Sequence, residues 1–227
     1  MSLDLLPSEY AAQLAIGAIR PWTGHHAGSA GLFEVRPRHI PRDVRPVFDE
    51  DLDCIIGYHR VFRERCYLYD LTGDMAAIWE GMKDLPPPAQ HDTLLVAGGL
   101  WAANVRGMTA LGIAGSGVAL APTTLAQLRK RFAGLTQVPL HFTEAAHASM
   151  DDARRFVPPH ILRLAMRLGQ RGNAPAEWPG AARYLARMSI MQLPCILDLV
   201  TVDDGTVVQF RHWRYAETRP DDAWPAA

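Results

Sequence analysis

The stretch VVQFRHWRY, residues 207–215, has the composition of a β-strand but carries cationic side chains on both faces. The two-residue period of a strand places Arg211 on one face and His212 and Arg214 on the other. A guanidinium binds a carboxylate or a phosphate through paired hydrogen bonds, and an imidazole exchanges a proton near neutral pH. These residue types could therefore bind an anion and move a proton.

A second strand-like stretch, IIGYHRVF at residues 55–62, combines the same residue types. There the two-residue period separates His59 from Arg60. If the fold brings both strands to one cleft, their arginines clamp an anion and their histidines donate or accept a proton. The alternative is a solvated sheet face on which arginine stems cover aromatic rings. The predicted catalytic residues are His59 and His212, and the predicted ligand-binding arginines are Arg60, Arg211 and Arg214.

The glycine-rich stretch GHHAGSAG, residues 24–31, is the third candidate. Glycines allow positive φ and a close approach of the backbone, so this loop could direct N–H groups toward an anion. We therefore add His25, His26 and Ser29 to the predicted ligand-binding residues, in a loop that covers the site. The stretch has neither the GxxxxGK(S/T) spacing of a phosphate-binding loop nor a GxSxG motif, so a mobile surface loop is the competing interpretation.

The three cysteines, Cys54, Cys66 and Cys195, lie in separate apolar runs. This placement is typical of buried, reduced thiols rather than of a disulfide framework or a zinc site. The sequence has no HExxH or CxxC motif, so we predict no metal site, and the cofactor stays unknown. Reduced thiols and the lack of a recognisable signal sequence favour a cytoplasmic location.

Residues 93–121 form the least polar window of the chain, with Arg106 near the centre and six glycines. A central arginine is costly in a bilayer, and glycine weakens a helix. We therefore interpret this window as a buried passage of the core rather than as a membrane span.

The net charge of the chain is -1, but residues 123–191 hold ten basic and four acidic residues, a local charge of +6. Arg163, Arg167 and Arg171 contribute a series at helical spacing. Such a segment can bind a nucleic acid, or it can face the acidic flanks within the fold or across a homodimer. We favour the second interpretation, without a nucleic-acid partner, because no nucleic-acid-binding signature accompanies the arginines.

The periodicity of the apolar residues predicts an α+β fold, with a mainly antiparallel sheet and helices packed on one face. We expect a single domain over residues 1–217 and a flexible C-terminal tail over residues 218–227. Asp203, Asp204 and Gly205 predict the tight turn of a hairpin. The predicted helices are residues 8–19, 74–83, 123–134, 160–171 and 180–191, and a short helix before Pro158 that is capped by Ser149. The predicted strands are residues 32–35, 53–61, 65–70, 93–97 and 138–142, and the two arms of the hairpin within residues 194–216.

The leading functional hypothesis is a cytoplasmic protein, without a membrane span, that binds a small anionic molecule of the carboxylate, phosphate or acyl type. Histidine acid–base chemistry would make this protein an enzyme, with a transferase as one reaction class. The first alternative is a non-catalytic sensor or protein-interaction module that uses the same sheet face. The second alternative is a nucleic-acid-binding protein that uses residues 123–191.

Overall fold

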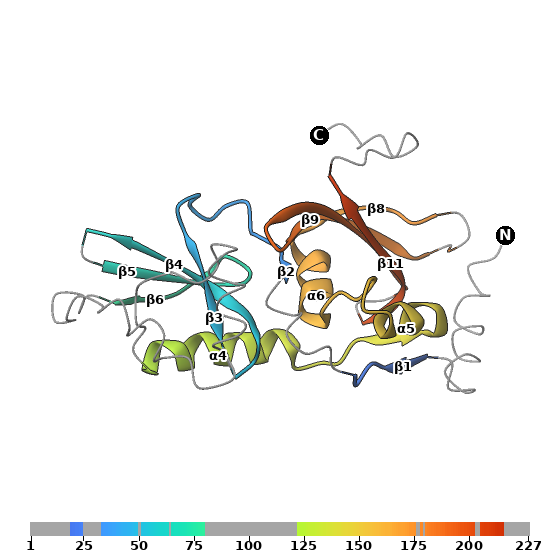
Figure 1. Cartoon of the computed structure of the whole chain (residues 1–227), viewed down its shortest axis with the longest axis horizontal. Helices are drawn as coiled ribbons and strands as arrows, with labels where there is room; N and C mark the ends of the chain where they lie inside the picture. Colours follow the sequence, from blue (N-terminus) through green and yellow to red (C-terminus); the bar gives the residue numbers. More distant parts are fainter. Residues whose placement is uncertain are drawn as a thin grey trace.

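The computed structural model arranges the described chain in two β-sheets and three helices (Figure 1). The structure describes residues 19–24, 33–49, 51–63, 65–79, 122–175, 178, 180–202 and 205–215. The expected mixture of helices with mostly antiparallel strands is confirmed, but the described strands form two sheets rather than one. Outside the described residues lie most of the predicted helix at residues 8–19, the strand at residues 93–97 and the tail at residues 218–227.

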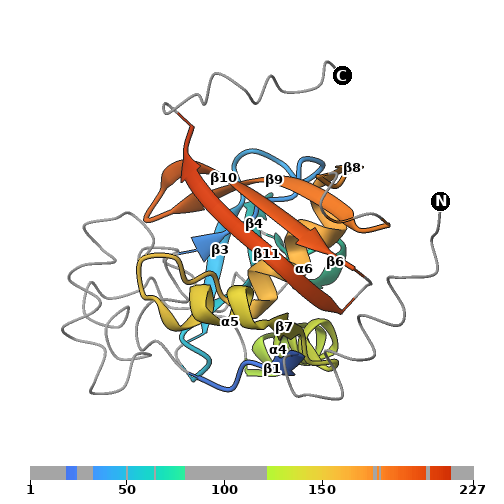
Figure 2. The same cartoon turned by 90° about the vertical axis from the view of Figure 1, so that its right-hand side faces the viewer.

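The larger sheet has the strand order β1-β7-β11-β10-β9-β2, and β8 also pairs with β9. All of its pairs are antiparallel except β11 with β7. Its centre is the predicted hairpin, in which β10 and β11 pair with Asp198 opposite Arg211. Figure 2 shows β9, β10 and β11 as a curved layer in front of α6. The strands are β1 (Ile19–Pro21), β2 (Phe33–Glu34), β7 (His141–Thr143), β8 (Gln170–Asn173), β9 (Ala182–Ile190), β10 (Leu193–Thr201) and β11 (Thr206–Arg214).

The smaller sheet is an antiparallel meander in the order β3-β4-β5-β6. The predicted strands that correspond to β4 and β5 are confirmed. The helix predicted at residues 74–83 is wrong over residues 75–79, where β6 places Ile78 opposite Tyr67 of β5. Pairing satisfies the backbone groups along the edge of β5, which outweighs the weak helix propensity of a short segment. The strands are β3 (Arg45–Asp49), β4 (Cys54–Phe62), β5 (Arg65–Asp70) and β6 (Met75–Trp79).

The strand β9 corrects a second helix prediction, at residues 180–191. Its buried residues Tyr184, Ala186 and Met188 recur with the period of two that is typical of a strand with one face on the core. The four-residue spacing of Arg183 and Arg187 fits one face of a helix, but it also keeps two side chains on one face of a strand. Continuous pairing with β10 determines the conformation.

The described helices are α4 (Pro122–Thr136), α5 (Glu144–Asp151) and α6 (Pro159–Leu168), and α4 together with α6 links the two sheets. Helix α4 contacts β4, β5 and β6 of the smaller sheet and also contacts α6, which in turn contacts β9 and β10 of the larger sheet. Figure 1 shows α4 running along the smaller sheet with its C-terminal end near α6. The structure confirms the predicted helices at residues 123–134 and, up to Leu168, at residues 160–171.

Two local predictions about these helices are wrong. The hydroxyl of Thr143 accepts the N–H of Ala146 and caps α5, so Ser149 lies inside the helix rather than at its start. Helix α6 ends at Leu168, and Arg171 belongs to β8. The arginine series of the basic segment is therefore interrupted and does not form one continuous helical ridge.

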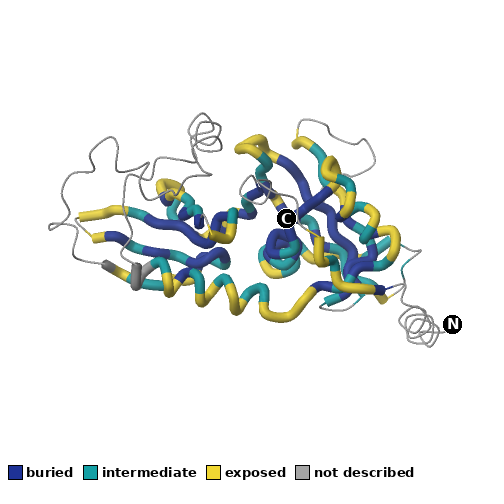
Figure 3. Tube along the Cα trace, turned by 60° about the horizontal axis from the view of Figure 1, so that its bottom comes forward, coloured by how far each residue is buried: buried dark blue, intermediate teal, exposed yellow. Residues whose placement is uncertain are grey.

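The largest buried cluster combines residues of both sheets and of α6, such as Tyr58 of β4, Leu164 of α6 and Leu197 of β10. Figure 3 shows buried backbone concentrated in the strands and in α6, whereas α4 alternates between exposed and partly buried positions. Among the described side chains of α4, Leu128 is fully buried and packs with a second, smaller cluster in the smaller sheet. The core thus holds the smaller sheet, α4, α6 and the larger sheet in contact.

Gly57 of β4 lies where α4 approaches the smaller sheet. A Cβ at this position would lie 2.5 Å from the carbonyl oxygen of Tyr69 and 3.0 Å from Cδ2 of Leu128. Because a backbone atom blocks the methyl group, we expect Gly57→Ala to lower the free energy of unfolding by about 1 to 3 kcal/mol. Urea denaturation measures this change.

The control for this prediction is Gly134→Ala on α4. An added Cβ there has nothing within 4 Å, and alanine favours helix over glycine by about 1 kcal/mol. This variant should therefore be at least as stable as the wild type. A loss of stability of equal size in both variants would contradict the close packing at Gly57.

Candidate anion-binding site

The predicted site residues from the two strands lie in different sheets. His59 and Arg60 belong to β4 of the smaller sheet, and Arg211, His212 and Arg214 belong to β11 of the larger sheet. Outside the described residues lie the three predicted residues of the glycine-rich loop, His25, His26 and Ser29.

Two of the predicted arginine ligands bind carboxylates of this chain. Nε of Arg60 donates to Oδ2 of Asp43 at 2.8 Å, and its guanidinium lies 5.0 Å from the centre of the Phe62 ring. Nε of Arg211 donates to Oδ2 of Asp198 at 2.9 Å. An anionic ligand at either arginine would have to share the guanidinium with this carboxylate.

Asp198 is a buried carboxylate that two arginines bind together. Its side chain is only 4 % exposed, and Arg183 donates to its two oxygens at 2.8 and 3.0 Å. Arg211 adds a further charged hydrogen bond from β11. Paired, charge-assisted hydrogen bonds of this kind satisfy a carboxylate that has lost its water. Arg183, which belongs to the basic segment, thus faces an acidic residue of the same fold.

The two predicted catalytic histidines occupy sheltered positions. His59 is only 2 % exposed. Burial lowers the pKa of His212, and a hydrogen bond with the backbone of Arg154 acts in the opposite direction. Neither histidine lines the cavity described next, and neither do Arg60, Arg211 and Arg214. The clamp that these residues were expected to form stays a prediction.

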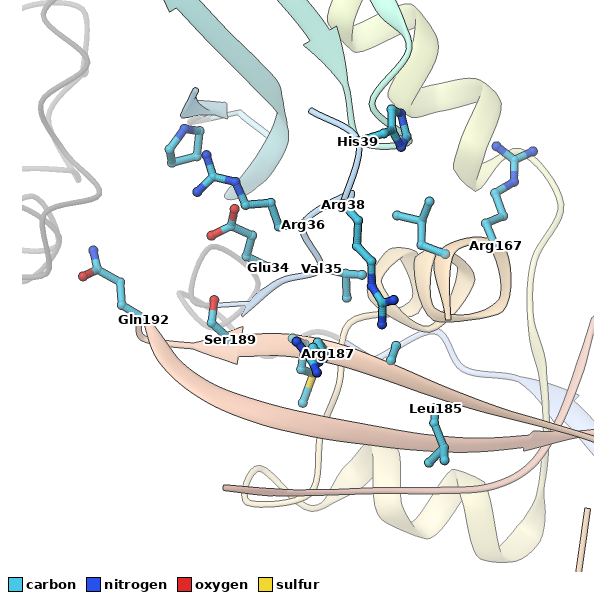
Figure 4. A pocket seen from close by; sticks show the side chains of 14 residues that line it. Glu34, Val35, Arg36, Arg38, His39, Arg167, Leu185, Arg187, Ser189 and Gln192 are labelled. Carbon is cyan, nitrogen blue, oxygen red and sulfur yellow. The ribbon is translucent and has the colours of Figure 1, made fainter. Parts of the chain in front are cut away.

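A different group of basic residues lines a cavity of about 860 Å³ (Figure 4). The cavity lies between the segment that follows β2, the C-terminal end of α6 and strand β9. Among the described residues, its walls contain four arginines and one histidine but a single acidic residue. These charged or titratable residues are Glu34, Arg36, Arg38, His39, Arg167 and Arg187.

The cavity lies at a gap along the outer edge of β9. Strand β8 pairs with residues 182–185 of that edge, and β2 pairs with residues 189–190. Neither strand pairs with residues 186–188, which line the cavity. Pro37, three residues after Glu34, has no N–H group that could extend the pairing along β9.

Two of the four cavity arginines are positioned by the fold. Nη2 of Arg36 donates to the carbonyl oxygen of Val44, and its guanidinium lies 5.7 Å from the centre of the Tyr58 ring. The guanidinium of Arg187 lies 5.8 Å from the centre of the Tyr215 ring. Cation–π contacts of this kind fix the direction of a guanidinium without neutralising it. Both arginines therefore contribute positive potential from fixed positions.

The other two arginines, Arg38 and Arg167, have no hydrogen-bond or ion-pair partner among the described residues. In Figure 4 the side chain of Arg38 extends across the cavity toward β9, whereas the guanidinium of Arg167 points away from β9. A guanidinium without a carboxylate partner can bind an incoming carboxylate or phosphate through two hydrogen bonds. Arg38 is therefore the side chain best placed to bind an anion in this cavity.

Glu34 is the acidic residue among the described residues of the cavity wall. Its Oε1 is buried and has no hydrogen-bond partner in the part of the chain that the structure describes. Burial raises the pKa of this carboxyl group, while the charge of Arg36 and a hydrogen bond with Tyr58 oppose the rise. The Glu34 carboxyl group is thus easier to protonate than an exposed one, and one of its oxygens has no hydrogen bond within the described part of the chain.

No metal-binding cluster emerges from the described residues, in which no three His, Cys, Asp or Glu side chains come together. The three cysteines are buried, as expected from their apolar surroundings. Burial, with the neighbouring charges of Asp49 and Asp53, raises the pKa of Cys54 to about 12. A thiol with such a pKa stays protonated at neutral pH and is a poor nucleophile.

Sequence reasoning missed the cavity arginines because they come from three separate segments, around β2, at the end of α6 and in β9. The local signal was the motif RPRH at residues 36–39, which places two arginines and a histidine directly after a short strand. Its proline, Pro37, predicts an irregular segment, and irregular segments of this kind are common places for ligand sites.

Comparison with known proteins identifies no relative: no family model, no curated protein and no solved structure matches this chain. The described helices include none that is long and apolar enough to cross a membrane. The apolar window at residues 93–121 lies outside the described part of the chain.

Proposed function

We propose that this protein binds a small organic anion in the cavity beside β9. The observation that carries the proposal is the Arg38 guanidinium, which extends into the cavity without a carboxylate partner among the described residues. Arg36 and Arg187 add positive charge from fixed positions, and Glu34 is the one acidic residue in the walls. The chemistry is the one expected from the sequence, an arginine-bound anion, but the proposed arginines are different.

The walls also favour a ligand with an apolar body. Six lining residues are apolar: Val35, Pro46, Leu168, Leu185, Ala186 and Met188. A ligand site typically combines such surfaces with a few polar groups that fix the orientation of the ligand. We therefore favour a carboxylate or acyl-type anion with a hydrocarbon part over inorganic phosphate. The polar side chains of Ser189 and Gln192 complete the lining.

The test is a thermal-shift and calorimetric comparison of octanoate, octanesulfonate and inorganic phosphate at low ionic strength. A ligand that binds only the folded protein stabilises it by about 2.7 kcal/mol at a concentration one hundred times its Kd. We expect both octyl anions to raise the unfolding midpoint, and phosphate to raise it less.

Replacing Arg38 with glutamine should weaken octanoate binding by about 10- to 100-fold, because a charged hydrogen bond contributes about 1.5 to 3 kcal/mol. The matched control is Arg42→Gln in the same segment, because Arg42 is exposed and does not line the cavity. Calorimetry on the two variants separates binding in the cavity from a general attraction to positive charge. Equal losses in both variants would argue against the cavity as the site.

We further propose, as the sequence predicts, that residues 1–217 form one cytoplasmic domain with its helices packed on one face of a sheet. A role for His59 and His212 in catalysis remains a separate prediction, which a chemical change in the bound anion would support.

The first alternative is a sensor or interaction module, such as a homodimer. It would gain support if no anion shifted the midpoint and sedimentation showed a concentration-dependent oligomer. Binding of an oligonucleotide that weakens steeply with salt would support the nucleic-acid alternative.

A further inference from the structure

Glu34 lies at the end of β2, where it pairs with Ser189 of β9, and both residues line the cavity. Oε1 of Glu34 is buried and has no hydrogen-bond partner among the described residues, although four arginines line the same cavity. A buried polar atom without a partner destabilises the folded protein, and more so when the group is charged. Protonation of the carboxyl group, or a hydrogen bond with a ligand, removes part of this cost.

An anion in the cavity changes the balance between the two states of this carboxyl group. A negative charge close to an ionised carboxylate disfavours ionisation, so the bound anion drives the carboxyl group toward its protonated form. Once protonated, the group becomes a hydrogen-bond donor, and the anion is an acceptor for that donor. The proton comes from the solvent, and no covalent bond of the ligand changes.

We propose that the cavity takes up one proton together with its anion, and that Glu34 carries this proton and donates it in a hydrogen bond to the anion. This inference rests on the proposed function and adds the regulation of the site: binding strengthens as the pH falls. The ligand class narrows accordingly, to anions whose oxygen atoms can accept one hydrogen bond from a carboxyl group as well as those from Arg38.

The other groups that face Glu34 shape this response. Arg36 and the Tyr58 hydroxyl group favour the ionised form, because one is cationic and the other donates a hydrogen bond. Burial favours the protonated form and has the largest effect. The remaining titratable or charged groups of the cavity are Arg38 and His39 after β2, Arg167 on α6 and Arg187 on β9. Of these side chains, only the imidazole of His39 can both take up and release a proton, so it is the competing proton carrier.

The experiment is isothermal titration of the full chain with octanesulfonate from about pH 8 to about pH 5, in pairs of buffers with different ionisation enthalpies. A sulfonate stays ionised over this range, so any proton taken up on binding resides on the protein. We expect up to one proton per ligand in the wild type, and an affinity that rises by up to about tenfold per pH unit.

Three variants identify the residue that carries the proton taken up on binding. Glu34→Gln keeps the shape of the side chain and always has an N–H donor, so it should bind octanesulfonate with little proton uptake and little pH dependence. Glu144→Gln, at an exposed position on α5, should behave like the wild type. His39→Gln should also retain the uptake. Proton uptake that persists in Glu34→Gln, or binding to the wild type without proton uptake, would overturn the assignment to Glu34. Absence of binding at every pH would instead overturn the proposed function, and this inference with it.

Discussion

Replacing Arg129 with methionine will lower the free energy of unfolding by about 3 kcal/mol, close to the cost of breaking a buried ion pair. Arg129 of α4 donates from Nε and Nη2 to the two oxygens of Asp49, at 2.5 and 3.0 Å, and also to Asp51. The side chain of Asp49 is completely buried, whereas that of Arg129 is 40 % exposed. The substitution therefore leaves a buried carboxylate without its cation.

The loss should stay near the lower end of the range known for buried pairs because two other donors remain. The backbone N–H groups of Asp51 and Leu52 donate to Asp49 at 3.0 and 3.2 Å. These hydrogen bonds keep the turn between β3 and β4 closed, but they do not neutralise the charge. Water can also enter where the exposed part of Arg129 was.

Urea denaturation of Arg129→Met measures the effect, and Lys130→Met is the matched control on the same helix. Lys130 is exposed and has no ion-pair or hydrogen-bond partner among the described residues, so its replacement should change stability by less than about 0.5 kcal/mol. A double replacement of Asp49 by asparagine and Arg129 by methionine should recover part of the loss, because it removes the unpaired charge. Similar effects of the two single methionine variants would show that the ion pair does not hold α4 on the smaller sheet.

Lowering the pH from about 6.5 to about 4 should cost the wild type about 3 kcal/mol more stability than the His160→Leu variant loses. His160 lies on α6 and packs edge-on against Phe132 of α4, with ring centres 5.3 Å apart. Its Nε2 is buried, and none of the described residues forms a hydrogen bond with it. Burial lowers the pKa of His160 from its usual 6.5 to about 4.

The sign of this pH dependence follows from proton binding by His160 in the folded and unfolded states. Between the two pKa values of His160, the unfolded chain binds a proton that the folded protein does not bind. The free energy of unfolding therefore rises with pH through this window. Below the pKa that His160 has in the folded protein, the loss of stability caused by His160 reaches its full size. The pKa of His212 is also lowered by burial, so the variant should retain a smaller dependence of the same sign.

Thermal and urea denaturation at several pH values, at constant ionic strength, compare the wild type with His160→Leu. Leucine keeps an apolar side chain of similar size between α4 and α6, and it removes the titratable group. In acid, His160→Leu should become more stable relative to the wild type, and its free energy of unfolding should change less steeply with pH. Parallel stability curves for the two proteins would mean that folding does not lower the pKa of His160.

The class of the fold and several of its elements follow from local patterns in the sequence. The alternation of residues 53–61 and 65–70 predicted β4 and β5, because a period of two places one face of a strand on the core. The Asp-Gly dipeptide at residues 204–205 predicted the hairpin of β10 and β11, although Asp203 and Asp204 themselves lie outside the described residues. The recurring leucines of residues 123–134 predicted α4. Each of these signals lies within a few residues of the element that it specifies.

Tertiary structure alone determined the strands β6 and β9, the partners of the arginines and the cavity. Ile78 and Met188 lie in strands because the edges of β5 and β10 supply backbone partners, which a local pattern does not reveal. Arg60 and Arg211 look alike in the sequence as anion ligands, but each pairs with a carboxylate from another element. The cavity forms where β2 reaches β9 across more than a hundred residues of sequence, so its arginines converge only in the folded chain. Periodicity is a local property of the chain, whereas charge neutralisation and cavity shape depend on which distant segments become neighbours.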